Sequence, residues 1–318
     1  MLTTREPGLL IQLQTLLFVL LCTASVSVSA AQVTLTPVKD NTIFGDVGSG
    51  YEDNTCGTGD SLFSGQTDEN YSRRALLKFD IAGNIPANAI IDSVSLTLRI
   101  NRSRDNQDAD MTLHPLSRDW GEGTVGCGDG KGSGASTGDA TWQAAMHPPT
   151  QGNWTTPGGD FAAASATASV PSGNNQSGVW IGTATVNPGM VADVQNWLDN
   201  DAGNHGWIVV GDENRQKTVR RFDSREGNPQ PVLVVDFTPA VVSYACCFAN
   251  GNCTVADTTT CTSQGGNPDT NNNSCSPNPC PQPIGACCNY DQSCSDTVPR
   301  DVCESAGGTF QSGGSACT

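Results

Sequence analysis

"RRFDSREGNPQPVLVVDF" (residues 220–237) joins a cationic cluster to a run of strand-forming residues. In that run, Leu233, Val235 and Phe237 would share one face of a strand, because side chains alternate between the two faces. Comparable segments, rich in β-branched and alternating apolar residues, occur at 33–38, 73–81, 93–100, 178–186 and 206–212. Residues 31–238 are therefore predicted to form one all-β domain, a β-sandwich.

One helix is predicted within this domain, over residues 188–199. Its apolar positions follow helical spacing at Met190, Val191, Val194, Trp197 and Leu198. Asn187 is suited to cap the helix, Pro188 to its first turn, and Gly203 lies just beyond its end. The Gly/Ser/Ala-rich segment 121–178 is expected to be mostly loop.

The first thirty residues have the pattern of an export signal. A short apolar run, residues 16–21, is followed by small residues that lead to a cleavage-type sequence at 28–30. The run is well short of the ~20 residues that a membrane-spanning helix needs. We therefore expect a secreted or cell-surface protein without membrane insertion. Its net charge of −16 argues against nucleic acid as a partner, because phosphates require a basic face.

Cysteine is concentrated in residues 239–318, where two repeats (about 245–275 and 286–317) share the pattern ACC-x5-C-x7/8-C-x3-GG-x8-C. Such density in an exported chain predicts small disulfide-stapled modules rather than a zinc site. The pairing stays open for Cys56, Cys127, Cys246, Cys247, Cys253, Cys261, Cys275, Cys280, Cys287, Cys288, Cys294, Cys303 and Cys317. The repeats and their spacer hold an odd number, eleven, so one thiol is expected to pair with Cys56, Cys127 or another chain.

Motifs for catalysis are weak, and no catalytic residue is predicted. Residues 59–62 spell GDSL, but no histidine follows at the spacing that a nucleophilic Ser61 requires, so a turn before a strand is the better interpretation. The glycine-rich segment 128–133 lacks phosphate-loop spacing. No cofactor is expected, except a structural calcium ion for which Asp105, Asp108 and Asp110 could supply oxygen ligands.

The arginines of residues 220–225 admit two interpretations. On a strand, Arg221 and Arg225 share one face with Asp223, while Arg220 and Phe222 point the other way. The first interpretation is a cross-strand ion-pair ladder with Phe222 in the core. The second is a basic strip for uronic-acid carboxylates, which the guanidinium group can bind in bidentate fashion.

Other side chains could extend this candidate ligand site. Arg73, Arg74 and Lys78 would join the strip if their strand were its neighbour. Trp142 and Trp154, in the glycine-rich region, are either loop staples or flat platforms for sugar rings.

Several segments occur in the order typical of bacterial DNRLRE-domain proteins: 73–100, DWGEG (119–123), DATW (139–142), TPGGDF (156–161), VQNWL (194–198), NHGWIVVGDE (204–213) and 220–237. The chain resembles this family over about 33–238, and Asp223 to Glu226 approximates its name-giving motif. The resemblance implies a jelly-roll module similar to carbohydrate-binding modules, some of which bind alginate. The cysteine repeats resemble those of secreted proteins of planctomycete-like bacteria.

Together these observations predict a secreted, non-catalytic module that binds extracellular polysaccharide, expected to be acidic. One alternative is a structural surface or matrix protein that acts through contacts with other proteins. A second alternative is a polysaccharide lyase or hydrolase.

Overall fold

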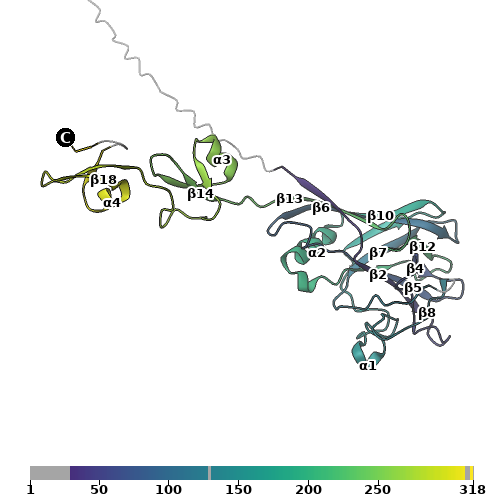
Figure 1. The fold of residues 1–318 in the computed structure, drawn as a ribbon. Coiled ribbons are helices and arrows are strands. Elements are labelled where there is room, and N and C mark those ends of the chain that lie inside the picture. The colour runs from purple at the N-terminus through teal and green to yellow at the C-terminus, as the bar shows by residue number, and fades with distance from the viewer. Residues whose placement is uncertain (1–28, 128–129, 312–315, 318) are drawn as a thin grey trace, which may run out of the picture.

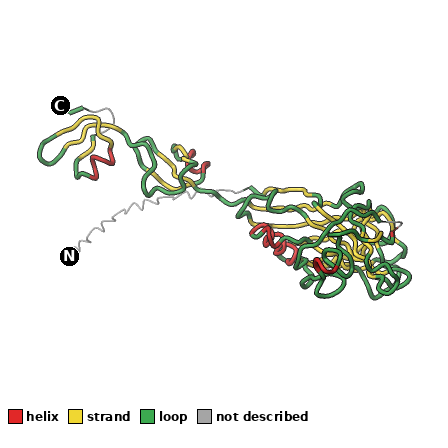
Figure 2. The backbone as a smooth tube through the Cα atoms, turned by 60° about the horizontal axis from the view of Figure 1, so that its bottom comes forward, coloured by secondary structure: helices red, strands yellow, loops and turns green. Residues whose placement is uncertain are grey.

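The computed structural model describes residues 29–127, 130–311 and 316–317. The predicted export signal therefore lies outside the described residues, except for Ser29 and Ala30. Figures 1 and 2 show a body rich in strands, from which two small repeats follow one another in a narrow tail. Among the described residues, no helix has the length and apolar character needed to cross a membrane.

The body is an antiparallel β-sandwich, as predicted. Its eleven-stranded sheet follows the path β1-β13-β6-β12-β4-β5-β11-β7-β9, with β10 added beside β6 and β2 beside β5. The strands are β1 (Ala31–Leu35), β2 (Lys39–Gly45), β4 (Ser61–Gln66), β5 (Ser72–Lys78), β6 (Ile90–Ser103), β7 (Ala109–Pro115), β9 (Ala166–Val170), β10 (Gln176–Gly182), β11 (Trp207–Val210), β12 (Arg220–Asp223) and β13 (Val232–Thr238). A further short pair joins β3 (Asn54–Thr55) to β8 (Ser133–Gly134).

Strand β4 links the two layers of the sandwich. Its first residues pair with β12, and Gly65 and Gln66 pair with β5. Gly65 has a φ of +118°, and a Cβ there would come within 2.8 Å of the backbone of Thr218. Only glycine allows β4 to pass from one layer to the other here without displacing the segment that contains Thr218.

The main core lies between the layers. It takes side chains from both, such as Leu98 and Ile100 of β6 and Leu77 of β5, together with Phe222 of β12. The long strand β6 therefore fixes one side of the core through alternate residues, as its period of two predicts.

Helix α2 (Pro188–Asp199) has the predicted bounds and packs Met190, Val194, Trp197 and Leu198 into the core. The expected cap at Asn187 is wrong. Asn187 has a φ of 44° and makes no capping bond, because its Oδ1 accepts the backbone N–H of Thr167 at 3.2 Å; its side-chain amide donates to the carbonyl of Ile181 at 2.9 Å. The hydrogen bond to Ile181 joins the start of the helix to β10. The 121–178 segment, expected to be mostly loop, also contains β9, the first residues of β10 and the short α1 (Pro149–Gly152).

Each cysteine repeat is a small three-stranded sheet with one short helix. Repeat 1 comprises β14 (Tyr244–Cys247), β15 (Cys253–Ala256), α3 (Thr258–Ser263) and β16 (Asn267–Asp269). Repeat 2 comprises β17 (Ile284–Cys288), β18 (Cys294–Pro299), α4 (Arg300–Ser305) and β19 (Thr309–Phe310).

Disulfides staple the repeats, as predicted. The pairs in the tail are 246–261, 247–280, 253–275, 287–303 and 294–317. Cys56 pairs with Cys127 inside the sandwich. Neither of these two is therefore available to the odd thiol of the tail, which is Cys288.

Candidate functional site

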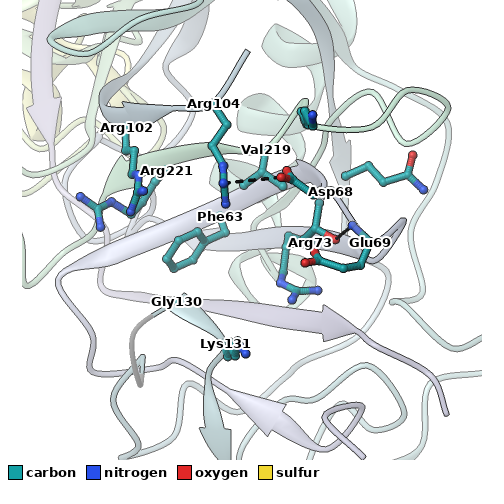
Figure 3. A pocket seen from close by; sticks show the side chains of 13 residues that line it. Phe63, Asp68, Glu69, Arg73, Arg102, Arg104, Gly130, Lys131, Val219 and Arg221 are labelled. Carbon is teal, nitrogen blue, oxygen red and sulfur yellow. Dashed lines mark hydrogen bonds and ion pairs between the residues drawn. The ribbon is translucent and has the colours of Figure 1, made fainter. Parts of the chain in front are cut away.

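A basic hollow lies on the outer face of the sandwich where β4, β12 and β6 run side by side (Figure 3). Arg221 of β12 is paired with Phe63 of β4 on one side and with Arg102 of β6 on the other. Residues directly opposite one another on neighbouring strands point to the same face. These three side chains therefore form a row across the three strands, with the nearly buried Phe63 ring at its floor.

A β-bulge determines which side chains form this row. The register between β12 and β6 shifts after Arg221, so that Phe222 pairs with Ile100 and Asn101 is the extra residue. Asn101 accepts a hydrogen bond from Nε of Arg221 through its Oδ1. Its Nδ2 donates to Asp223 at 2.6 Å. Asn101 thus holds Arg221 in place without neutralising it.

Further cations surround the row. Arg104, Lys131 and Lys217 line the hollow, and all three side chains are exposed. Figure 3 shows Arg104 pointing toward Asp68, from which its guanidinium is 3.5 Å away. Including Arg73, six of the sixteen Lys and Arg residues of a strongly acidic chain line this one hollow. Asp68 and Glu69 are the acids in the lining.

The charges at the centre of the hollow are not compensated. Arg221 and Arg102 lie directly opposite each other, and neither makes an ion pair within the described residues. Asp223, the acid nearest in sequence, is bound by Arg99 at 3.0 Å. Like charges opposite one another destabilise a sheet. The hollow can offset this cost by accepting an anion between the two guanidinium groups.

The hollow is too small to enclose a drug-sized ligand. Its volume is about 230 Å³, below the roughly 300–1,000 Å³ of pockets that enclose a drug-sized ligand.

One family model matches part of the sandwich. The model of carbohydrate-binding module family 96 matches residues 31–143. This stretch of the sandwich is similar to a carbohydrate-binding module. It contains Phe63, Arg102, Arg104 and Lys131 of the hollow, whereas Arg221 lies beyond it. No curated protein shows significant similarity to the chain.

Arg220, one position before Arg221, points away from the basic hollow into the interior. It is fully buried, and its guanidinium donates to Asp105 Oδ1 at 2.8 Å. It also donates to the carbonyls of Pro171 at 2.9 Å, Thr218 at 3.0 Å and Gln107 at 2.6 Å. Arg220 is therefore a structural residue that ties three loops together, and a ligand could not reach it.

Arg225 lies outside the hollow, in a cluster of acids. Its guanidinium is 2.9 Å from both Glu122 and Glu226. Its backbone N–H donates to Oδ2 of Asp40, a fully buried carboxyl. Burial, followed by the nearby charges of Glu226 and Glu122, raises the pKa of Asp40 to about 8. The predicted cross-strand ladder therefore holds for Asp223, which Arg99 of β6 binds, but not for Arg221, which makes no ion pair within the described residues, or for Arg225, which lies in the turn beyond β12.

The basic side chains of β5 were predicted to extend the ligand site. This extension is largely absent, because β4 separates β5 from β12. Arg73 does line the hollow, but it is buried and bound at both of its terminal nitrogens by Asp46. Arg74 faces a second hollow and is paired in bidentate fashion with Glu213 at 2.8 Å. Lys78 is paired with Lys39 of β2 and is distant in the sheet from β12.

The two candidate tryptophans are loop staples. Trp142 is 9% exposed and Trp154 is 4% exposed, and both pack in a second apolar cluster with Trp120. Arg74 covers the ring of Trp142 at 4.7 Å from its centroid, and Trp154 donates to the carbonyl of Thr141. Neither ring presents a free face on which a sugar could stack.

The acids considered for calcium have other roles. Asp105 is bound by Arg215 and Arg220. Asp108 accepts the backbone N–H of Ser172, while Asp110 is exposed on β7. The described residues contain no group of three or more His, Cys, Asp or Glu that could hold a metal ion.

The sequence interpretation missed Arg102, Arg104, Lys131 and Lys217. Simple alternation along the strand predicted at 93–100 would place Arg102 on the same face as the buried Ile100, and only the bulge at Asn101 turns Arg102 outward. Periodicity therefore could not identify it. Lys131 and Lys217 come from loops that approach the hollow only in the folded chain.

Proposed function

We propose that the protein is a secreted, non-catalytic module that binds acidic extracellular polysaccharide in the basic hollow. The observation that carries the proposal is the uncompensated pair of Arg102 and Arg221, held opposite each other in a chain of net charge −16. A polymer bearing carboxylates would supply the missing anions, and guanidinium groups bind carboxylates in bidentate fashion. The similarity to carbohydrate-binding module family 96 supports polysaccharide as the ligand class.

The composition of the hollow also supports binding without catalysis. Within the described residues, its lining includes no histidine or tyrosine, and Asp68, one of its two acids, faces Arg104. A proton-transfer mechanism needs a group whose pKa is near the working pH. Arginine and lysine side chains dominate the lining, and these cationic groups are suited to holding an anion.

The proposal predicts the outcome of affinity electrophoresis with the full chain. The gels would contain alginate, pectin, a neutral glucan or no polymer, each with calcium and with a chelator. We expect the uronate polymers alone to retard the protein. Each charge-assisted contact contributes about 1.5–3 kcal/mol, so Arg221→Gln or Arg102→Gln is expected to weaken binding by about ten-fold or more.

Arg118→Gln is the matched control. It removes the same charge from a side chain that is paired with Asp160 away from the basic hollow. We expect its affinity to stay within about two-fold of the unaltered protein. Equal mobility in all gels would refute polysaccharide binding, and retention that survives Arg221→Gln would refute this site. Release of unsaturated or reducing ends from the polymer would instead establish an enzyme.

A further inference from the structure

The two cysteine repeats can be compared position by position. In repeat 1, the turn at 248–252 is closed by bonds from Phe248 N to Asn252 O and from Gly251 N to Phe248 O. In repeat 2, the turn at 289–293 is closed by the same two bonds, Asn289 N to Ser293 O and Gln292 N to Asn289 O. Gly251 and Gln292 both have positive φ, at 82° and 67°. The two turns are therefore structural equivalents.

The turn of repeat 1 is covered by the spacer that follows it. Asn278 and Gln282 each donate a side-chain amide to the carbonyl of Gly251 at 2.9 Å. Between them in sequence, Cys280 forms a disulfide with Cys247, at the foot of the turn. Cys247 is only 9% exposed as a result.

The next repeat adds a contact to the same turn. Arg300, at the start of α4, donates to the carbonyl of Asn250 at 2.8 Å and to Oδ1 of Asn252 at 3.1 Å. Repeat 1 thus presents a docking face that receives a cysteine-bearing linker and an arginine from the unit after it.

The equivalent face of repeat 2 lacks this cover within the described residues. Cys288, the counterpart of Cys247, is half-buried and forms no disulfide; its sulfur is 3.4 Å from that of Cys294. Tyr290, on the turn, is 97% exposed. The other two disulfides of repeat 1 have counterparts in repeat 2. The disulfide without a counterpart is therefore the one that joins repeat 1 to its linker, between Cys247 and Cys280.

We propose that this open face, Cys288 with the turn Asn289–Ser293, binds a cysteine-bearing linker of a partner polypeptide, as residues 276–283 cover repeat 1. The linker would donate side-chain amides to the carbonyl of Gln292 and form a disulfide with Cys288. Asp291 stands where repeat 1 has Asn250, so an arginine of the partner would meet a carboxylate there. The contact is head-to-tail, a geometry that can be propagated from unit to unit.

A second copy of this chain does not supply such a linker. Its Cys280 is already joined to Cys247, and the segment before repeat 1, residues 239–243, contains no cysteine. The proposed partner is thus a different polypeptide with a linker of this composition, rather than residues 239–283 of a second copy.

Thiol–disulfide exchange is the covalent step. The Cys288 thiolate attacks the partner's cysteine sulfur in a mixed disulfide with a small thiol. The new sulfur–sulfur bond forms as the old one breaks, and the small thiol leaves as a thiolate with the electron pair. The proton of Cys288 passes to solvent, so no external oxidant is consumed.

A synthetic peptide with the sequence of residues 276–283 provides the test. Its cysteine is activated as the mixed disulfide of thionitrobenzoate, whose coloured thiolate is released on reaction with the full chain. The control peptide has alanine in place of the residues matching Asn278 and Gln282 but carries the same activated sulfur. We expect the linker peptide to react with Cys288 at least ten-fold faster than this control, because only the linker peptide can dock on the turn.

Cys288→Ser identifies the reacting thiol and is expected to abolish the release of colour. Equal rates for the two peptides would overturn the proposal, since Cys288 would then be an ordinary accessible thiol. Absence of reaction with either peptide would also overturn it. These results are independent of polysaccharide binding, which is measured on the sandwich.

Discussion

Replacing Arg220 with alanine is expected to lower the free energy of unfolding of the sandwich by about 3–5 kcal/mol, the usual cost of breaking a buried ion pair. The guanidinium of Arg220 is fully buried and serves Asp105 and three backbone carbonyls. Asp105 keeps Arg215 at 2.7 Å, but the carbonyls of Pro171, Thr218 and Gln107 lose their donor. Buried acceptors without partners account for much of the expected loss.

Urea unfolding followed by tryptophan fluorescence would measure this effect. All six tryptophans lie between residues 120 and 207, so the signal reports the sandwich and not the cysteine repeats. Arg221→Ala, one residue further along β12, is the control and is expected to change stability by less than about 1 kcal/mol. If Arg220→Ala lowered the free energy of unfolding by less than about 1 kcal/mol, other contacts would have to hold the three loops.

The second large effect concerns the buried acid Asp40. Because its pKa is raised to about 8 in the folded protein, from an ordinary value near 3.8, the folded state holds a proton that the unfolded state has lost between these pH values. Stability is therefore lost as the pH rises through this range. The slope is about 1.4 kcal/mol per pH unit. Between pH 5 and pH 9, Asp40 is expected to cost about 4 kcal/mol.

Asp40→Asn removes this cost. The amide oxygen of asparagine can still accept the N–H of Arg225, which now bonds to Oδ2 of Asp40. We expect the variant to match the unaltered protein near pH 5 and to be several kcal/mol more stable at pH 9. Urea unfolding at both pH values, in a Cys288→Ser background that prevents disulfide exchange in alkali, would measure the difference.

Asp236→Asn provides a control of opposite sign. Hydrogen bonds from Ser93 and Gln32 lower the pKa of Asp236, so its contribution is present at neutral pH and is lost in acid. Parallel pH profiles for Asp40→Asn and the unaltered protein would contradict the ionisation that we assign to Asp40.

The fold could largely be read from periodicity. The alternating segments that became β5, β6, β10, β11 and β13, and the helical spacing of α2, each bury a strong apolar face, so local pattern and core agree. The strands β2, β7 and β9 were missed. In β2, Asp40, Asn41 and Thr42 are buried polar residues satisfied mainly by contacts with distant loops, which a pattern of apolar residues does not reveal.

The site was harder to predict because it depends on strand order. The alternation of Arg220 and Arg221 correctly separated an inward from an outward side chain. It did not show that Arg102 would be the neighbour of Arg221, since these residues are far apart in sequence and are paired only through a bulge. Likewise, Trp142 and Trp154 lie in glycine-rich sequence yet are buried, because Arg74 and neighbouring loops cover them.

The bulge at Asn101 also has an evolutionary consequence. Deleting Arg102 would restore a regular ladder with Asn101 opposite Arg221, whereas deleting Asn101 would leave Arg102 opposite Arg221 and remove the acceptor of the Arg221 Nε hydrogen bond. Ile100 and Phe222 would keep their places in the interior. Loss of a single codon can therefore remove one cation from the basic hollow while the hydrophobic interior is inherited unchanged.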